Sequence, residues 1–324
     1  MRREAERTGS VDAKGIKPIG SPFPQATAET GYYGLPLLKP PVWTWEVPLY
    51  FFVGGAAGAA AVVGAAAQTA GADRDLVRDA RWIAAAGAAL SMPLLIADLG
   101  RPGRFLNMLR VFKLQSPMSV GAWTLTAFGT FAAASAFAEE MRRRTKLPVT
   151  LVGDAAAMLS AATGLGMATY TGVLIGATAI PVWSKHVSLL PLHFGASATA
   201  SAVSILQLIG HDECALQYLG LAAALFESFV GLRIERAGDP TLTQGPTGLT
   251  TRIGGFFSGP LPLVLRMLGI RWRNARTAAA LSTLMGSLIT RFAWVEAGKA
   301  SVWRSDRGAT NGTAARRARI RVRP

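Results

Sequence analysis

The residue with the clearest chemical potential in this chain is Asp98, which closes the apolar run of residues 84–97. An unpaired carboxylate in hydrocarbon is costly, so this side chain must either find a partner at the lipid boundary or line a polar site. Arg101 follows three residues later, the spacing at which helical side chains meet, and Pro102 ends a helix there. A carboxylate beside a guanidinium near lipid can hydrogen-bond a quinone carbonyl and pass protons. The alternative is an interfacial ion pair that caps the helix.

Three further residues fit a site for a quinone ring. Glu46 opens the first apolar run and Asp98 closes the second, so antiparallel neighbours would bring both carboxyl groups to one membrane face. Tyr170 lies in the fourth run, where its phenol could bond a quinone oxygen or only a neighbouring helix. Trp123, near the start of the third run, is predicted to be an interfacial anchor or to stack on the ring.

A second set of ionisable residues, Asp154, Glu227 and Arg291, lies in or beside other apolar runs. Intramembrane acids usually face the interior of a helix bundle, so these three residues are candidates for a transmembrane proton relay. Two alternatives stay open. Glu227 could be a buried, protonated acid bonded to a neighbouring helix, and Arg291 could stack on Trp294 or pair with an acid across the bundle.

Long apolar segments must position these side chains. Of the 324 residues, 50% are hydrophobic and 16% charged, and segments of about 20 apolar residues can cross a bilayer core of about 30 Å. Such segments occur at 47–69, 82–98, 119–138, 157–181, 191–209 and 214–232. Residues 277–298 would add another, whereas the glycines and prolines of 252–270 predict a broken or re-entrant helix. We expect an all-α fold, a polytopic transmembrane helix bundle of seven or eight spans that forms two four-helix bundles.

Small residues predict how these spans pack. Glycine or alanine recurs every four residues from Gly164 to Gly176, and Gly54 and Gly58 repeat that spacing in the first span. Ridges of small residues let neighbouring helices approach closely. We therefore interpret these glycines as packing surfaces.

The charge pattern divides the chain into three parts. Residues 1–43 are polar and rich in proline, which favours an extended arm, residues 44–300 form the transmembrane domain, and residues 301–324 form a basic tail. The formal charge of +15 is concentrated in that tail and in loops, which fits anionic lipid headgroups or a partner subunit and not nucleic acid. The distribution of Lys and Arg predicts a multi-pass protein of the cytoplasmic (inner) membrane, with both termini and Asp98 on the cytoplasmic side.

Several kinds of resident cofactor do not fit the sequence. Cys214 is the only cysteine, so the chain alone cannot ligate an iron–sulfur cluster, and no pair of its three histidines is placed to hold a haem. No phosphate-binding loop, triad order or metal-ligand spacing stands out. We therefore expect a chain that holds no metal and works with partner subunits.

One stretch of sequence carries a family resemblance. Asp98-Leu99-Gly100-Arg101-Pro102 is followed by Phe105-Leu106-Asn107-Met108-Leu109, and residues 116–123 read Ser-Pro-Met-Ser-Val-Gly-Ala-Trp. This combination strongly resembles the NrfD family, which includes the membrane subunit of polysulfide reductase. Further similar segments are residues 45–55, 170–174, 179–183 and 291–298, so the resemblance covers about residues 43–300.

The resemblance implies a haem-free integral membrane subunit of a molybdoenzyme complex. Such a subunit exchanges electrons between a membrane quinone, menaquinone or ubiquinone, and a ferredoxin-like subunit with four iron–sulfur clusters. The molybdopterin catalytic subunit lies beyond that partner. Family quinone sites map onto Glu46, Asp98, Arg101 and Tyr170 of this chain. Two other classes stay open, a proton- or ion-translocating membrane subunit and a secondary transporter without quinone chemistry of its own.

Overall fold

The protein is built from helices that run nearly parallel to one long axis. The computed structural model describes residues 38–99, 102–145 and 150–321, and within these ranges it contains helices and no strand. The prediction of an all-α fold is therefore confirmed. The short helices η1 (Pro102–Arg104), α4 (Phe105–Met108), α7 (Pro181–Lys185) and α10 (Pro240–Thr243) lie in the connections.

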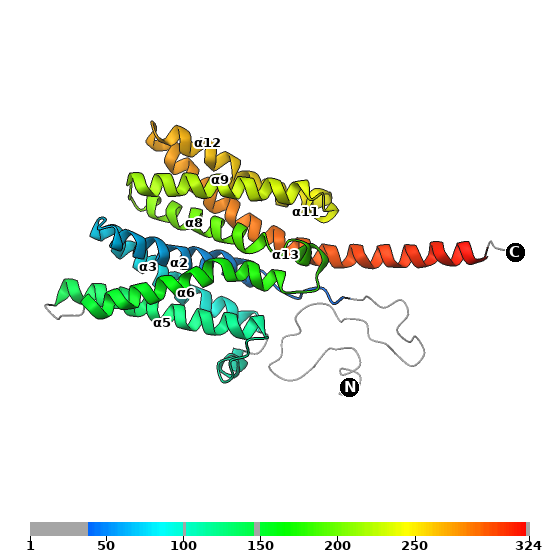
Figure 1. Cartoon of the computed structure of the whole chain (residues 1–324), viewed down its shortest axis with the longest axis horizontal. Helices are drawn as coiled ribbons and strands as arrows, with labels where there is room; N and C mark the ends of the chain where they lie inside the picture. Colours follow the sequence, from blue (N-terminus) through cyan, green and yellow to red (C-terminus); the bar gives the residue numbers. More distant parts are fainter. Residues whose placement is uncertain (1–37, 100–101, 146–149, 322–324) are drawn as a thin grey trace.

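The long helices form two four-helix bundles, as expected (Figure 1). The first bundle contains α2 (Glu46–Thr69), α3 (Arg74–Ala97), α5 (Pro117–Arg144) and α6 (Thr150–Gly176). The second contains α8 (Leu190–Leu208), α9 (Cys214–Arg236), the pair α11 (Gly245–Ser258) and α12 (Pro260–Gly269), and α13 (Arg273–Arg321). Helix α2 also packs against α8 and α13, so it joins the two bundles.

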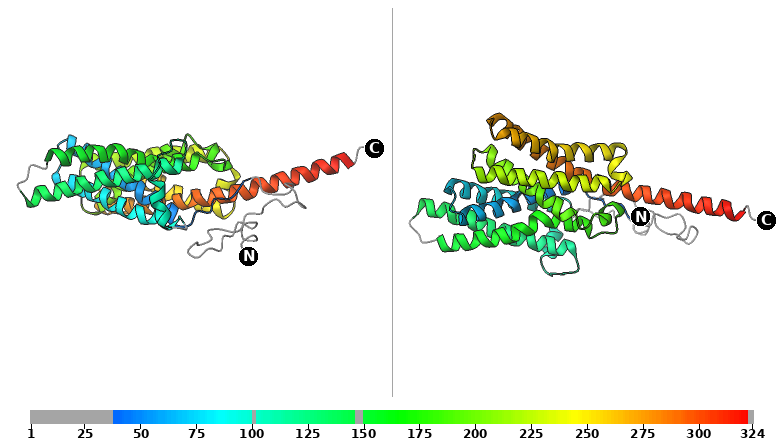
Figure 2. Two further views of the ribbon diagram at one scale, coloured as in Figure 1. Left: turned by 90° about the horizontal axis from the view of Figure 1, so that it is seen from below. Right: turned by 45° about the horizontal axis from the view of Figure 1, so that its top comes forward.

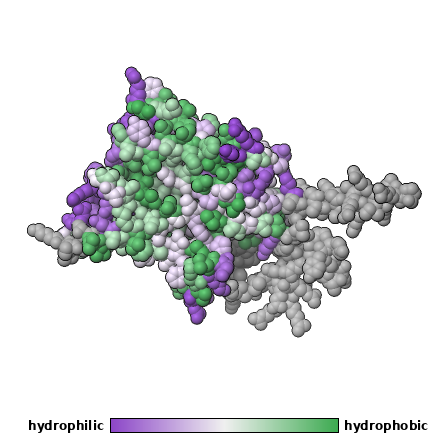
Figure 3. Space-filling model, viewed as in Figure 1, coloured by the Kyte–Doolittle hydropathy of each residue, from purple (hydrophilic) through white to green (hydrophobic). Residues whose placement is uncertain are grey.

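The number of membrane-spanning segments agrees with the prediction of about eight. Within the described part of the chain, six helices, α2, α3, α5, α6, α9 and α13, are long and apolar enough to cross a bilayer. Helix α8 and the α11–α12 pair run beside them within the second bundle. The predicted break is confirmed, because α11 ends at Ser258 and α12 begins at Pro260. Figure 3 shows a broad hydrophobic surface between hydrophilic ends, which is the pattern of a protein embedded in lipid.

The Asp98 end of the bundles carries the ends of four helices and a long extension of α13. At the Asp98 end lie the start of α2, the end of α3, the start of α5 and the end of α6. Helix α13 has 49 residues. At 1.5 Å per residue it is about 74 Å long, well beyond a bilayer of about 40–45 Å. It continues through residue 300 without a break and projects from the Asp98 end as a long arm (Figures 1 and 2).

Glycines set the distance between α2 and α6. A Cβ atom on Gly164 would lie 2.6 Å from the carbonyl oxygen of Gly58, and a Cβ on Gly58 would overlap the Gly164 carbonyl in turn. Gly172 makes a similar approach, because its added Cβ would lie 2.6 Å from the Leu190 backbone of α8. The predicted packing role of these glycines is confirmed.

We expect Gly58→Ala and Gly164→Ala each to lower the thermal unfolding midpoint of the purified protein in detergent. A new methyl group at this contact must push the two backbones apart, and overpacking of this kind costs about 1–3 kcal/mol. The matched control is Gly129→Ala on α5, whose new Cβ would lie at an ordinary 3.7 Å from Ala88. Equal midpoints for the control and the two test variants would contradict the assigned contact.

Candidate functional site

A narrow cavity lies at the Asp98 end of the first bundle, between α2, α3, α5 and α6. It encloses about 40 Å³. Its walls are mostly apolar, and the polar side chains that reach it include those of Tyr50, Asp98 and Tyr170. Met108 and Met118 also line it, and methionine side chains rearrange easily. A ring that entered from the lipid would have to move these methionines aside before it could meet the polar groups.

Asp98 is joined to Glu46 through Thr44. The backbone N–H of Thr44 donates to Asp98 Oδ1 at 3.4 Å, and its hydroxyl contacts the same oxygen at 3.1 Å. The Thr44 hydroxyl also contacts Glu46 Oε2. The two carboxyl groups, 52 positions apart in sequence, therefore share one hydroxyl group at one end of the bundle.

This arrangement favours a proton on Asp98. A hydroxyl group has one proton, so Thr44 can donate to only one carboxylate at a time. Its contact with the other becomes favourable when that carboxyl group is protonated and donates to the hydroxyl oxygen. Burial raises the pKa of Asp98 against the opposing hydrogen bonds from Thr44, which is consistent with a proton held there.

Tyr170 reaches the same cavity from α6. Tyr170 is 9% exposed, and its hydroxyl group has no described partner of hydrogen-bond geometry, although the Gly121 backbone approaches it. The ring lies against Gly121 of α5, where an added Cβ would stand 2.5 Å from Tyr170 Cε1. Gly121 thus leaves the space in which the phenol sits. A ligand oxygen in the cavity could supply the missing partner.

The other predicted members of the site lie elsewhere. Trp123 is on α5 but does not line the cavity; it is 37% exposed and meets Phe112 edge-on with ring centroids 6.1 Å apart. Arg101 lies outside the described residues. Two residues that sequence reasoning missed are Thr44 and Gly121. No spacing rule links them to Asp98, because their proximity arises from packing between helices.

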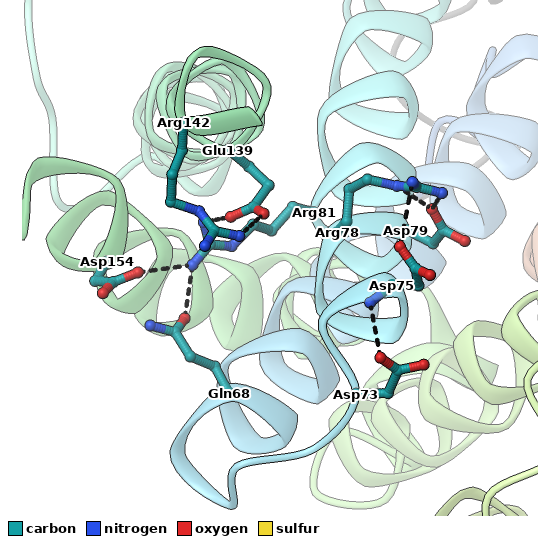
Figure 4. Close-up of polar contacts among 9 residues, drawn as sticks. All are labelled: Gln68, Asp73, Asp75, Arg78, Asp79, Arg81, Glu139, Arg142 and Asp154. Carbon is teal, nitrogen blue, oxygen red and sulfur yellow. Dashed lines mark hydrogen bonds and ion pairs between the residues drawn. The ribbon is translucent and has the colours of Figure 1, made fainter. Parts of the chain in front are cut away.

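Asp154 belongs to an ion-pair cluster at the opposite end of the first bundle (Figure 4). The cluster is centred on Arg81 of α3, which is 6% exposed. Its guanidinium lies 3.1 Å from Glu139 Oε2 and 3.0 Å from Asp154 Oδ1, and it donates to Gln68 Oε1 at 2.7 Å. These partners come from α5, α6 and α2, so one guanidinium ties four helices together beside a polar cavity of about 420 Å³.

Glu227 and Arg291 lie in the interior of the second bundle, away from Asp154. Glu227 of α9 is 2% exposed, and neither carboxylate oxygen has a partner of hydrogen-bond geometry, although Ser197 and Ser258 approach it. Arg291 of α13 donates to the Phe194 carbonyl at 3.1 Å. The three residues of the predicted relay are therefore divided between the two bundles.

Arg291 does not stack on Trp294, which was one of the two alternatives left open for it. The guanidinium lies 3.8 Å from the centre of the Phe194 ring instead. Trp294 meets His186 and His193 edge-on. Positions 291 and 294 differ by about 60° around the axis of α13. This rotation is enough for Arg291 to meet the Phe194 ring of α8 while Trp294 meets the histidines.

Comparison with known proteins identifies the family. Residues 37–211, more than half of the chain, match the model of the family described as "Polysulphide reductase, NrfD". The chain belongs to the NrfD family, whose members are membrane subunits of redox complexes and associate with iron–sulfur and molybdoenzyme subunits. The match takes in the first bundle and α8 and stops before α9. A search of curated proteins finds no matching relative.

The bridge through Thr44 predicts the effect of Thr44→Val on Asp98. Valine keeps the shape but removes a donor to the ionised carboxylate, so the pKa of Asp98 should rise further and the carboxyl group should stay protonated to higher pH. An infrared pH titration of the carboxyl C=O band, assigned by its loss in Asp98→Asn, measures this shift. Thr124→Val is the control, because that hydroxyl donates only to its own helix at Val120. A lower or unchanged Asp98 pKa in Thr44→Val would argue against the bridge.

Proposed function

We propose that this chain is the quinone-reactive membrane subunit of a respiratory oxidoreductase complex, with its reaction at the Asp98 cavity. One observation carries the proposal. At the Asp98 end of the first bundle, the hydrogen-bonded group of Asp98, Thr44 and Glu46 lies together with the Tyr170 hydroxyl group, which has no partner of hydrogen-bond geometry. These are the groups that a quinone ring needs, because each ring oxygen accepts or releases a proton as the ring is reduced or oxidised.

In this proposal the menaquinone or ubiquinone headgroup enters from the lipid between Met108 and Met118. One ring oxygen meets Asp98 and the other meets Tyr170. Reduction of the quinone takes up two electrons and two protons, and oxidation of the quinol releases them. Each ring oxygen exchanges one of the two protons, one with Asp98 and the other with the Tyr170 hydroxyl group. Thr44 passes the first proton between Asp98 and Glu46.

The electrons come from, or pass to, a partner subunit. We propose a ferredoxin-like subunit with four iron–sulfur clusters, attached in turn to a molybdopterin catalytic subunit. The family membership supports partners of this class. The Asp98 end is the proposed docking face, because electron exchange requires the cluster to lie close to the ring. The α13 arm projects from this end and would lie beside such a partner.

The proposed orientation in the membrane rests on the distribution of basic residues. The bias of basic residues supports the cytoplasmic membrane, with both termini and the Asp98 end in the cytoplasm. A partner docked at this end would then also be cytoplasmic. Accessibility labelling of a cysteine introduced into the α13 arm tests this orientation without reference to activity.

Asp98→Asn should abolish most quinone-linked electron transfer while the complex still assembles. The amide keeps the shape of the side chain but cannot exchange a proton, and loss of a positioned acid or base lowers rates by about 10²–10⁴-fold. Turnover with a soluble quinone analogue measures the effect. The control is Asp75→Asn, an exposed carboxylate at the opposite end of the same helix. Wild-type turnover in Asp98→Asn would remove this residue from the proposed site.

A second candidate function is ion translocation through the second bundle, favoured by a series of buried polar contacts. Arg266 of α12 donates to Gln207 Oε1 at 2.7 Å and to Ser204 Oγ at 2.8 Å. Farther along the same interior, the hydroxyl groups of Ser197 and Ser287 lie 2.7 Å apart, near Glu227. Buried groups of this kind inside a membrane usually serve transport or a proton path.

If this path carries protons, Glu227→Gln should lower quinone-linked proton uptake in proteoliposomes while electron transfer continues. Glutamine cannot release a proton, so a chain of transfers through this position is interrupted. Glu140→Gln on α5, a carboxylate of the first bundle that pairs with Arg144, is the control. Full proton coupling in Glu227→Gln would argue for a subunit that does not translocate ions by this route.

A further inference from the structure

A second and larger cavity lies in the second bundle, between α9, α11 and α13. It encloses about 270 Å³, several times the space at Asp98. Its buried end contains Glu227, His193, Ser258 and Thr290, and the rest of its lining is mostly apolar. A cavity of this kind, apolar with a few polar groups gathered at one end, is the usual form of a small-molecule site.

The polar groups at the buried end lack partners. Both carboxylate oxygens of Glu227, the His193 Nδ1 and the Thr290 Oγ1 are buried and have no described partner of hydrogen-bond geometry, although Ser197 and Ser258 lie near Glu227. Glu227, His193 and Thr290 are 2%, 4% and 3% exposed. Leaving one such group unsatisfied costs about 1–3 kcal/mol, so three of them facing one cavity indicate a ligand that supplies their partners.

The mouth of the cavity carries exposed apolar side chains on two helices, as expected of an opening to lipid. Leu232 of α9 and Phe256 of α11 stand at the opening and are 45% and 52% exposed. Phe229 and Ile253 extend the exposed apolar surface along the same two helices. A ligand that enters here must be soluble in the bilayer.

The charges at the site select against a phospholipid headgroup. Among the described residues that line the cavity, Arg252 is the only one with a permanent positive charge, and it lies at the mouth, 3.4 Å from Glu235. Arg291 does not line the cavity; its guanidinium is directed to Phe194, although its charge acts on Glu227. A carboxyl group, an imidazole and a hydroxyl suit a neutral ring that bears oxygen atoms able to donate or accept hydrogen bonds.

We propose that this cavity binds a second molecule of membrane quinone or quinol, with its ring at Glu227, His193 and Thr290 and its isoprenoid tail in the lipid. The inference rests on the proposed function in taking quinone as the ligand of this chain, but it concerns a separate site. Most of that site, α9, α11 and α13, lies in the part of the chain that the family match does not cover.

Aromatic residues connect the two cavities. Trp43 lines the first cavity and stacks on Trp183, with ring centroids 5.3 Å apart. Trp183 Nε1 donates to the backbone carbonyl of Trp294 at 2.9 Å, and Trp294 lines the second cavity. A ring bound at Glu227 would therefore be linked to the first site through a short series of packed side chains.

The cavity can be filled without disturbing its walls. Gly231 of α9 and Gly255 of α11 both line it, and an added Cβ at either position would meet nothing within 4 Å. Gly255→Leu should therefore occupy the space meant for the ring and remain compatible with the helix. Ala222→Leu, at an exposed position of α9, is the control for an added leucine on a lipid-facing helix. Gly121→Ala serves to displace Tyr170 and close the first cavity.

The test is the number of quinones bound per chain, measured by equilibrium binding of decylubiquinone and of a short-tailed menaquinone to the full-length protein in nanodiscs. We expect two for the wild type and for Ala222→Leu, one for Gly255→Leu, one for Gly121→Ala, and none for the double variant. Thr290→Val removes one hydrogen-bond donor from the site at Glu227. Added to Gly121→Ala, it should raise the quinone dissociation constant of the remaining site by about tenfold.

The outcomes separate this inference from the proposed function. One quinone in the wild type that is lost in Gly121→Ala and kept in Gly255→Leu would overturn the second site and leave the first intact. One quinone that is lost in Gly255→Leu and kept in Gly121→Ala would support the second site and overturn the first. Quinone binding that Gly255→Leu leaves unchanged, with a co-purified phospholipid lost instead, would also overturn the inference.

Discussion

The close contact between α2 and α6 at Gly58 and Gly164 is the constraint on which the rest of this structure depends. Because neither residue has a side chain, the two backbones meet directly, and α2 becomes the most buried of the candidate spans. From that central place α2 contacts α3, α6, α8 and α13. Its start carries Thr44 and Glu46 to Asp98, and its far side holds the second bundle. Lipid offers no hydrophobic force between helices, so this packing is what fixes both the bundle and the site.

The polar groups inside the molecule differ in how many hydrogen-bond partners they have. Two of the three guanidinium nitrogens of Arg81 have partners, which come from three neighbouring helices and fix one end of the first bundle. At the other end, Asp98 is bridged to Glu46 by a hydroxyl group, and this bridge can hold and release a proton. In the second bundle, Glu227 has no partner of hydrogen-bond geometry. Burying a polar group costs less free energy when the group has hydrogen-bond partners. We therefore interpret the Arg81 cluster as structural, and the groups at Asp98 and Glu227 as sites for chemistry.

The two cavities differ in a way that bears on how the protein works. The one at Asp98 is narrow, about 40 Å³, so a ring must displace lining side chains to enter it. The one at Glu227 is wider, about 270 Å³. Trp43, Trp183 and Trp294 connect them. A narrow site that must rearrange and a wider site beside it, joined by packed rings, would let one quinone turn over while another stays bound.

The sequence by itself determined the elements and the class. Long apolar runs predicted the spans, the glycines and prolines of 252–270 predicted the break at Gly259, and the Asp98–Pro102 motif indicated the family that the comparison identified. The joining of Glu46 to Asp98 at one end also followed from antiparallel order. Tertiary structure alone decided that Thr44 bridges them, that Asp154 belongs to Arg81, and that Trp123 faces outward. The physical reason is that hydropathy fixes which segments cross lipid, whereas the rotation and spacing of each helix depend on contacts between residues far apart in the chain.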